Sequence, residues 1–270
     1  MTSRGLCRAD LLLAEAADAG PVLGLDTSGP IGSIALAQQG RIVGEIVRPV
    51  TSHGASLPGA VADLLDSSGL RPADLAAIAV GIGPGSFTGL RIGLSYAKGL
   101  AFAGGSAVIG VSSLDAIALA ALESLSGRTK GAVCVTIDAR KGEVYAALYE
   151  IGSDALEKVM WDTVVPLKSL VVHLNHDTIM VGDDKASEAG ALLHEKGIEV
   201  TVVGKSALES RGRCVAAIGS SRLARGQIDR AENLEPVYVR PPEATFRVDG
   251  GRVRSEGVWS AERKNSFDNI

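Results

Sequence analysis

The sequence lacks most features that mark secreted, membrane-spanning or nucleic-acid-gripping proteins. Its three cysteines, Cys7, Cys134 and Cys214, lie far apart, which argues against a disulfide framework or a metal spacing and indicates reduced thiols. The net charge of −4 argues against a chain that holds nucleic acid unaided, because phosphate neutralisation needs a concentrated basic face. No apolar run is long enough to span a bilayer. We therefore expect a cytoplasmic protein without membrane contact, in which any RNA contact would need a basic partner.

Aromatic residues make up only 4% of the chain, but 46% of its 270 residues are apolar, enough for one large core or two smaller ones. Short β-rich runs alternate with longer alanine-rich segments, which is typical of an α/β fold whose sheets are covered by helices. We predict a flexible leader over residues 1–20, a first lobe over 21–125, a second lobe over 126–244 and a disordered tail over 245–270. The last helix of the second lobe could pack back on the first.

Local patterns place the elements of the first lobe. Strands are predicted over residues 22–26, 31–38 and 41–47, and another buried strand over residues 75–82. Leu57, Val61 and Leu64 fall at helical spacing, and residues 88–103 form the strongest predicted helix of the chain. The first lobe is therefore expected to be a sheet flanked by helices.

An internal repeat links the two lobes. Leu25-Asp26-Thr27-Ser28 is matched by Ile137-Asp138-Ala139-Arg140, and each aspartate precedes a leucine by ten residues. A strand, a tight turn and a returning strand at equal spacing indicate two copies of one supersecondary unit. In such a pair, turn amides and hydroxyls can face phosphates, and a strand-end aspartate can hold a hydrated Mg²⁺. Asp26, Thr27, Ser28 and Asp138 are therefore candidates for a phosphate site, with turn capping as the alternative role of the aspartates.

A glycine-rich turn, Gly83-Pro84-Gly85-Ser86-Phe87-Thr88-Gly89, runs directly into the long predicted helix. It lacks the Gly-Lys-Ser/Thr ending of a P-loop, and Phe87 stands where a nucleophile elbow needs serine. Ser86 or Thr88 can cap the helix, and an anion could still bind at its start. Gly83, Gly85, Ser86 and Thr88 are therefore further candidates for phosphate contact.

The long helix carries the clearest indication of an interface. Gly89, Gly93 and Ala97 follow at four-residue spacing and form a smooth stripe that another backbone could approach closely. The alternative is packing within the chain, against the helix that contains Leu57 and Leu64. The stripe is predicted to contact a partner, and the alternative stays open.

Longer blocks of sequence carry a family resemblance. They are Leu25-Asp26-Thr27-Ser28, the segment from Gly83 to Ala101, Ile109-Gly110-Val111-Ser112-Ser113-Leu114, the segment from Asp138 to Ala147, and Glu235-Pro236-Val237-Tyr238-Val239-Arg240. Together they resemble the bacterial TsaB family of tRNA threonylcarbamoyladenosine biosynthesis proteins, also called YeaZ, from about residue 21 to residue 243. The resemblance implies an α/β fold with two lobes, like that of actin and the Hsp70 ATPase, built from duplicated RNase H-like units.

The resemblance also implies a function. Members of the family act with the related catalytic subunit TsaD and the ATPase TsaE to transfer a threonylcarbamoyl group to N6 of the adenosine beside the anticodon. The TsaB-like chain is a non-catalytic partner that binds and organises TsaD through helices of its first lobe. It implies TsaD-like and TsaE-like partners, tRNA contact only through the complex, and no cofactor of its own. A homodimer of the isolated chain, and weak ATP or ADP binding alone or at the complex interface, stay open. The interface residues it implies are His53, Leu57, Val61, Leu64, Gly89, Leu90, Gly93, Leu94 and Ala97.

Few residues of this chain indicate catalysis or metal binding. His53 is single where the catalytic relative has two metal-binding histidines on one helix, and His173 and His176 lack a nearby carboxylate or cysteine pattern. Arg140 and Lys141 bring bulky cations to the second turn, where close phosphate contact favours small residues. Two alternatives remain. One is an independent ATP-binding or sugar-kinase-like enzyme, and the other is a glycoprotease-type metallopeptidase, although the sequence has no H-E-x-x-H helix.

Overall fold

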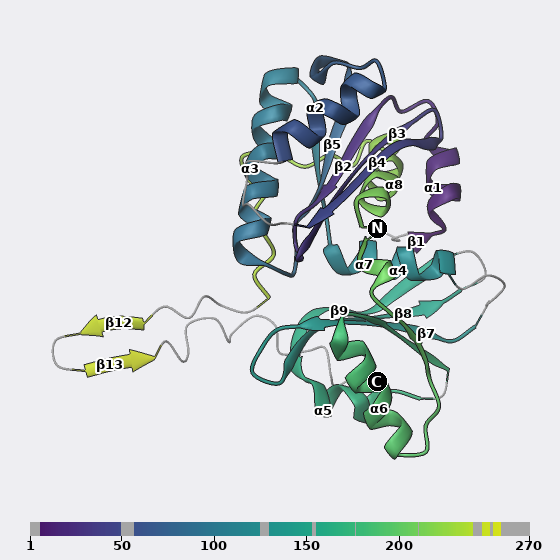
Figure 1. Ribbon diagram of the computed structural model, residues 1–270, viewed down its shortest axis with the longest axis vertical. Coiled ribbons are helices and arrows are strands. Elements are labelled where there is room, and N and C mark those ends of the chain that lie inside the picture. The colour runs from purple at the N-terminus through teal and green to yellow at the C-terminus, as the bar shows by residue number, and fades with distance from the viewer. Residues whose placement is uncertain are drawn as a thin grey trace.

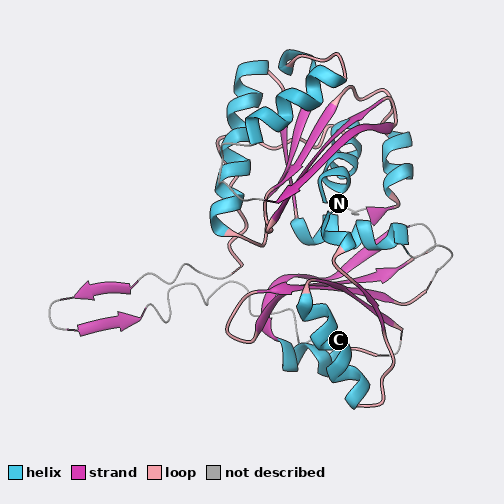
Figure 2. Cartoon of the chain, viewed as in Figure 1, coloured by secondary structure: helices cyan, strands magenta, loops and turns pink. Residues whose placement is uncertain are grey.

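The computed structural model describes residues 6–49, 57–124, 130–152, 155–175, 177–209, 211–239, 245–248 and 251–254. Two lobes lie one above the other in Figure 1, each with a twisted sheet at its centre. Figure 2 shows helices packed on both faces of the first sheet and against the second. Two of the candidate residues, His53 and His176, lie outside the described part of the chain.

The first lobe is built on a five-stranded sheet. Its strands are β2 (Val22–Asp26), β3 (Ile31–Gln38), β4 (Arg41–Pro49), β5 (Ala77–Gly81) and β6 (Ala107–Val111). They follow the order β4-β3-β2-β5-β6, in which β2, β3 and β4 are antiparallel neighbours and β5 and β6 run parallel to β2. β2 and β5 are buried at every residue because helices cover both faces.

The second lobe repeats this plan. Its strands are β7 (Ala132–Asp138), β8 (Glu143–Ile151), β9 (Ala155–Pro166), β10 (Thr178–Gly182) and β11 (Thr201–Val203), in the order β9-β8-β7-β10-β11, and the short β1 (Leu6–Cys7) pairs beside β9. Strand directions also match those of the first lobe. The predicted α/β class and the two-lobed, actin-like fold of duplicated RNase H-like units are confirmed.

The helices occupy equivalent places in the two repeats. In the first lobe, α2 (Leu57–Ser67) and the 3₁₀ turn η1 (Pro72–Asp74) precede β5, α3 (Phe87–Gly104) precedes β6, and α4 (Ser113–Ser124) follows it. In the second, α5 (Leu167–Leu170) and η2 (Val171–His173) precede β10, α6 (Asp184–Glu195) precedes β11, and α7 (Ser206–Glu209) and α8 (Arg211–Ala224) follow it. No helix in the described ranges is long and apolar enough to cross a membrane.

The last helix of each repeat packs across the boundary between the lobes. α8 follows the second sheet in the sequence but lies on β2, β3 and β5 of the first sheet. α4 follows the first sheet and contacts β7, β8, β9 and β10 of the second. One apolar cluster therefore runs from sheet to sheet, with Ile109 from β6, Ile117 from α4, Val135 from β7 and Ala216 from α8 among its members. The two lobes share a core.

Both chain ends differ from the sequence-based expectation. The expected flexible leader contains α1 (Ala9–Glu15), which packs on α8 and buries Leu12 and Leu13. The acidic residues Asp10 and Glu15 lie on the exposed side of this amphipathic helix, so the expectation of a flexible leader is wrong for residues 9–15. The expected disordered tail contains a hairpin, β12 (Thr245–Val248) with β13 (Gly251–Arg254), and is wrong there as well. Residues 255–270 lie outside the described part.

Candidate functional site

Asp26 is the last residue of β2, and its carboxylate is completely buried, which is rare for a charged side chain. The chain turns immediately after it, toward β3. Ser28 stabilises this turn by donating twice to Asp26 Oδ1, from its amide at 2.9 Å and from its Oγ at 2.6 Å. Asp26 therefore caps its own turn.

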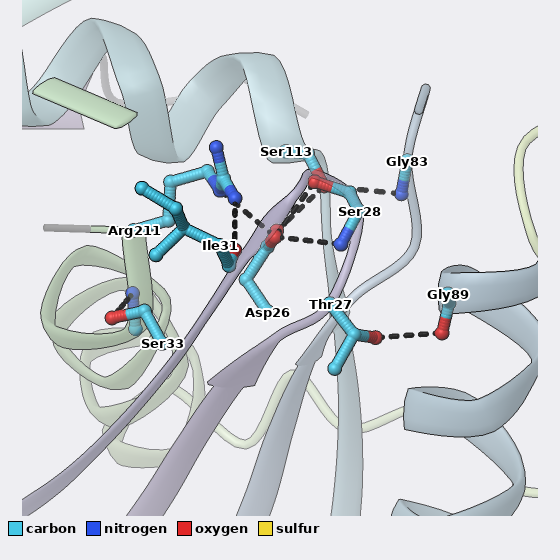
Figure 3. Close-up of polar contacts among 10 residues, drawn as sticks. Asp26, Thr27, Ser28, Ile31, Ser33, Gly83, Gly89, Ser113 and Arg211 are labelled. Carbon is cyan, nitrogen blue, oxygen red and sulfur yellow. Dashed lines mark hydrogen bonds and ion pairs between the residues drawn. The ribbon is translucent and has the colours of Figure 1, made fainter. Parts of the chain in front are cut away.

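Arg211, the first residue of α8, supplies the counter-charge for Asp26 (Figure 3). Its Nε lies 2.9 Å from Asp26 Oδ1, and its Nη2 donates to the Ile31 carbonyl at 2.7 Å. The second carboxylate oxygen, Oδ2, accepts from Ser113 Oγ at 2.7 Å. Burial by itself would raise the pKa of Asp26, but the Arg211 charge and the hydrogen bonds from Ser28 and Ser113 outweigh it and lower the pKa. Asp26 is an ionised carboxylate with both oxygens occupied.

The glycine-rich turn and the start of α3 close the Asp26 turn from the other side. Ser86 N donates to the Ser28 carbonyl at 2.7 Å, and Thr27 Oγ1 donates to the Gly89 carbonyl at 2.7 Å. A Cβ at Gly89 would lie 2.0 Å from the Thr27 carbonyl oxygen, and one at Gly93 would lie 2.3 Å from Thr27 Oγ1. The small residues of α3 are therefore required by a close approach within the chain.

The residues predicted to face a phosphate come together in the first lobe but contact one another. Thr27 and Ser28 are buried, and Ser86 Oγ caps α3 by accepting from Gly89 N at 3.3 Å. Because Arg211, Ser28 and Ser113 occupy both oxygens of Asp26, the turn does not fit a hydrated Mg²⁺. Of the candidates, Asp26, Thr27, Ser28, Gly83, Gly85 and Ser86 surround this closed turn, Thr88 is exposed on α3, and Asp138 belongs to the second lobe.

The second turn differs from the first in both backbone conformation and environment. Asp138 is exposed, and its Oδ1 accepts from Arg140 N at 2.9 Å. Its amide donates to Asp183 Oδ2 at 2.8 Å, and Asp183 is also the N-cap of α6. Arg140 and Lys141 both have left-handed backbone angles, with φ of 65° and 56°. Within the described ranges, no group of three His, Cys, Asp or Glu side chains is arranged to hold a metal ion.

Most residues predicted to contact a partner are buried inside the first lobe. Leu57 is partly buried, whereas Val61, Leu64, Gly89, Leu90, Gly93, Leu94 and Ala97 are all buried. The small-residue stripe of α3 lies against the Thr27 turn and the first-lobe core. The prediction that this stripe meets a partner is therefore wrong, because the chain itself covers it.

The side of α3 that faces away from the first-lobe core is exposed, and it also carries Arg91 and the partly buried Lys98. Ser95, Gly99 and Phe102 follow one another along it, and Phe102 is 93% exposed. A Cβ at Gly99 would meet no heavy atom within 4 Å. α2 lies beside α3 over the same core (Figure 1), and its Gly59 and Ala62 are exposed as well. These five residues are called the outer α2–α3 face.

An aromatic group extends this face at the start of α3. Arg91 lies over the Phe87 ring, with Cζ 3.9 Å from the ring centroid, and its Nε donates to Tyr238 OH at 3.1 Å. The Phe87 and Tyr238 rings are 5.4 Å apart between centroids. Val237 N donates to the Ile82 carbonyl at 2.8 Å and holds this late segment beside β5. Sequence reasoning missed the group because 147 positions separate Arg91 from Tyr238.

Known proteins are similar to this chain over most of its length. A family model described as TsaD, tRNA N6-adenosine threonylcarbamoyltransferase, matches residues 34–208. The tRNA threonylcarbamoyladenosine biosynthesis protein TsaB of Escherichia coli is 31% identical, over 85% of this chain and 98% of the relative. The protein of the same name from Bacillus subtilis is 34% identical, over 83% and 95%. The solved structure of YeaZ from Pseudomonas aeruginosa is 30% identical with a TM-score of 0.66, over 81% of this chain and 99% of that one.

Proposed function

The chain belongs to the TsaB family of tRNA threonylcarbamoyladenosine biosynthesis proteins, also called YeaZ, and on this premise we propose that it is a non-catalytic partner subunit. In this role it binds a TsaD-like catalytic subunit and organises it for threonylcarbamoyl transfer to the adenosine beside the anticodon. The observation that carries the proposal is a contrast within the first lobe: the turn around Asp26 is closed, whereas the outer α2–α3 face exposes the large apolar side chain of Phe102.

The closed turn supports a role without chemistry. Transfer to an amino group needs a metal ion, or an acid and a base, at the reacting atoms. The strand-end carboxylate Asp26 is buried and already neutralised by Arg211. Where side chains are described, no His, Cys, Asp and Glu group could hold a metal. The catalytic groups therefore belong to the TsaD-like partner.

The outer α2–α3 face supports a protein partner. Phe102 is a large apolar side chain that the chain leaves 93% exposed, and such residues often anchor interfaces. Beside it, Ser95 and Gly99 on α3, like Gly59 and Ala62 on α2, leave low relief over which a partner helix can approach closely. The face combines one aromatic anchor with a smooth surround. In isolation, two copies of the chain could pair through the same face.

The same geometry bears on nucleotide and RNA. We propose that the chain holds no nucleotide of its own, because the polar groups of Thr27 and Ser28 are already hydrogen-bonded within the chain. Thr27 Oγ1 donates to the Gly89 carbonyl, Ser28 Oγ donates to Asp26, and the Ser28 carbonyl accepts from Ser86 N. ATP turnover in the pathway then belongs to a TsaE-like partner. The net charge of −4 favours tRNA contact through the complex rather than through this chain alone.

Reconstitution with the cognate TsaD-like and TsaE-like proteins, tRNA and the threonylcarbamoyl donor tests this role. Omitting the chain should abolish modified adenosine, measured by mass spectrometry of digested tRNA. The purified chain alone should show no steady-state ATP hydrolysis. Full modification without the chain, or robust ATP turnover by the chain alone, would contradict the proposal.

A further inference from the structure

A second polar cluster joins the two lobes at the start of α4. Ser112 and Asp115 come from the end of β6 and the first turn of α4, while Tyr149 lies on β8 and Lys158 and Asp162 lie on β9. The side chains of Lys158, Asp162 and Asp115 are 12%, 13% and 25% exposed. The Asp26 turn and the outer α2–α3 face do not include any of these five residues.

The ammonium group of Lys158 is the centre of this cluster. Lys158 Nζ donates to Asp115 Oδ1 at 2.7 Å and forms an ion pair with Asp162 Oδ1. Ser112 Oγ donates to Asp162 Oδ2 at 2.7 Å, and Tyr149 OH donates to Asp115 Oδ1 at 2.7 Å. The Ser112–Asp162 bond runs from the end of the first sheet to β9 of the second. The bonds of Lys158 and Tyr149 to Asp115 hold the first turn of α4 on the second sheet.

Adjacent serines connect this cluster to the closed turn of the first lobe. Ser112 Oγ donates to Asp162 in the second lobe, and Ser113 Oγ donates to Asp26 in the first. Ser113 N also donates to the Gly83 carbonyl at 2.8 Å. The dipeptide lies where the chain leaves the first sheet and enters α4. Two polar networks therefore meet at the point where the chain passes toward the second lobe.

We propose that the Ser112–Ser113 dipeptide and the Lys158 cluster form an interlobe lock, which holds the two lobes at one fixed angle. Lobes that close around a ligand turn about a few residues that are free to change their backbone angles. Here the residues at the passage between the lobes, Ser112 and Ser113, form hydrogen bonds to Asp162 of the second lobe and Asp26 of the first. The shared apolar core is not directional and permits small rotations, whereas hydrogen bonds to charged groups fix distance and angle. The lock makes the chain a rigid body.

The charge balance makes Lys158 the residue on which the lock depends. Burial raises the pKa of Asp162, the Lys158 charge lowers it in part, and the nearby Asp115 raises it again, so that the pKa stays above its ordinary value. Burial lowers the pKa of Lys158, but both aspartates outweigh this effect and raise it. Without the ammonium group, the partly buried carboxylates of Asp115 and Asp162 would repel each other, and Asp162 would no longer be held in place for Ser112.

The distribution of distances between the lobes of the full chain tests the lock. Spin labels at Asp66→Cys on α2 and Glu195→Cys on α6, both exposed, would report this distance by double electron–electron resonance. Cys7→Ser removes one native thiol. Cys134 and Cys214 are buried and can stay. The labelled chain without further changes should give one narrow distribution.

Three variants separate the lock from general effects on the fold. Lys158→Gln removes the central charge, and Ser112→Ala removes one bond across the boundary. Lys185→Gln is the control, because it breaks an ion pair with Glu188 that lies within the second lobe. Lys158→Gln should broaden the distance distribution about twofold or add a second distance. Ser112→Ala should broaden it less. The control, Lys185→Gln, should leave the mean and the width of the distribution unchanged.

The outcome is decided by variants that keep their circular dichroism spectrum. If Lys158→Gln and Ser112→Ala leave both the mean and the width unchanged, the lock is refuted. If Lys158→Gln does not fold, Ser112→Ala alone decides: a broader distribution supports the lock, and an unchanged one overturns it. The measurement uses no partner protein, so it is independent of the proposed role in tRNA modification.

Discussion

Arg211 and Asp26 stand 185 positions apart in the sequence, yet Arg211 Nε lies 2.9 Å from Asp26 Oδ1 and both side chains are buried. The pair ties the first turn of α8 to the end of β2, which returns the last helix of the second repeat to the first lobe. It also occupies the carboxylate that a phosphate-bound cation would need. One ion pair therefore joins the two repeats and occupies the carboxylate at the end of β2.

Breaking this pair should destabilise the chain strongly. Arg211→Met leaves a buried carboxylate without its counter-charge, and the expected loss in the free energy of unfolding is about 3–5 kcal/mol. Urea unfolding followed by circular dichroism measures it. Arg71→Met is the matched control, because it breaks an exposed pair with Asp74 and should cost far less. Equal losses in the two variants would show that the buried ion pair contributes no more to the free energy of unfolding than the exposed one.

The pKa of Asp26 predicts a pH dependence of stability. Because the native pKa is lowered, the contribution is complete above the pKa of an unfolded aspartate, about 3.9, and is lost as the pH falls through the native pKa. The free energy of unfolding should therefore decrease in acid. Asp26→Asn should lack this part of the slope in urea titrations at a series of pH values, and an unchanged slope would argue against it.

Asp162 should shift the pH dependence in the opposite direction. Its native pKa is raised, so the folded chain binds more protons than the unfolded chain in the window between the ordinary and the native pKa. Stability should fall as the pH rises through that window. The Asp162→Asn variant should remove this decrease while it retains the acid loss due to Asp26, and the same urea series measures both. A decrease that persists in Asp162→Asn must come from another group.

Gly93 is buried and Gly99 is exposed on the same helix, so they offer a matched pair of substitutions. A Cβ at Gly93 would lie 2.3 Å from Thr27 Oγ1, so Gly93→Leu should cost about 1–3 kcal/mol of stability or more. A Cβ at Gly99 meets nothing within 4 Å, so Gly99→Leu should melt near the wild-type temperature. Thermal unfolding compares the two. Loss of the fold in Gly99→Leu, with a stable Gly93→Leu, would reverse the assignment of the two faces.

The buried thiols should be inert in the folded chain. Burial raises the pKa of Cys134 to about 12 and raises that of Cys214 well above its ordinary value. A thiol reagent such as dithiobis-nitrobenzoate should therefore label neither residue until denaturant is added. Rapid labelling of both under native conditions would show that the shared core opens readily.

Local elements could be predicted from the sequence because their signals are local. The strand expected over residues 22–26 is β2, and the helix expected over 88–103 is α3 at Phe87–Gly104. The repeat around Asp26 and Asp138 also corresponds to two equivalent hairpins. In each case, hydrophobic pattern and turn chemistry act over a few residues.

Contacts between distant residues could not be predicted in the same way. The sequence pattern of α3 shows a stripe of small residues, Gly89, Gly93 and Ala97, but it does not show whether a partner or the chain's own Thr27 turn covers that stripe. No spacing rule connects Arg211 to Asp26. The charged appearance of residues 1–20 likewise conceals an amphipathic helix whose partner, α8, lies two hundred positions later.

The most direct test of the proposed role is the affinity of this chain for the TsaD-like protein of the same organism, measured by titration calorimetry and gel filtration. Phe102→Glu introduces a charge on the outer α2–α3 face, and Val172→Glu makes the same kind of change at a 65% exposed valine of the second lobe. The wild type and Val172→Glu should form the complex, and Phe102→Glu should not. The account is contradicted if the wild type does not bind, or if Phe102→Glu binds as tightly as the wild type.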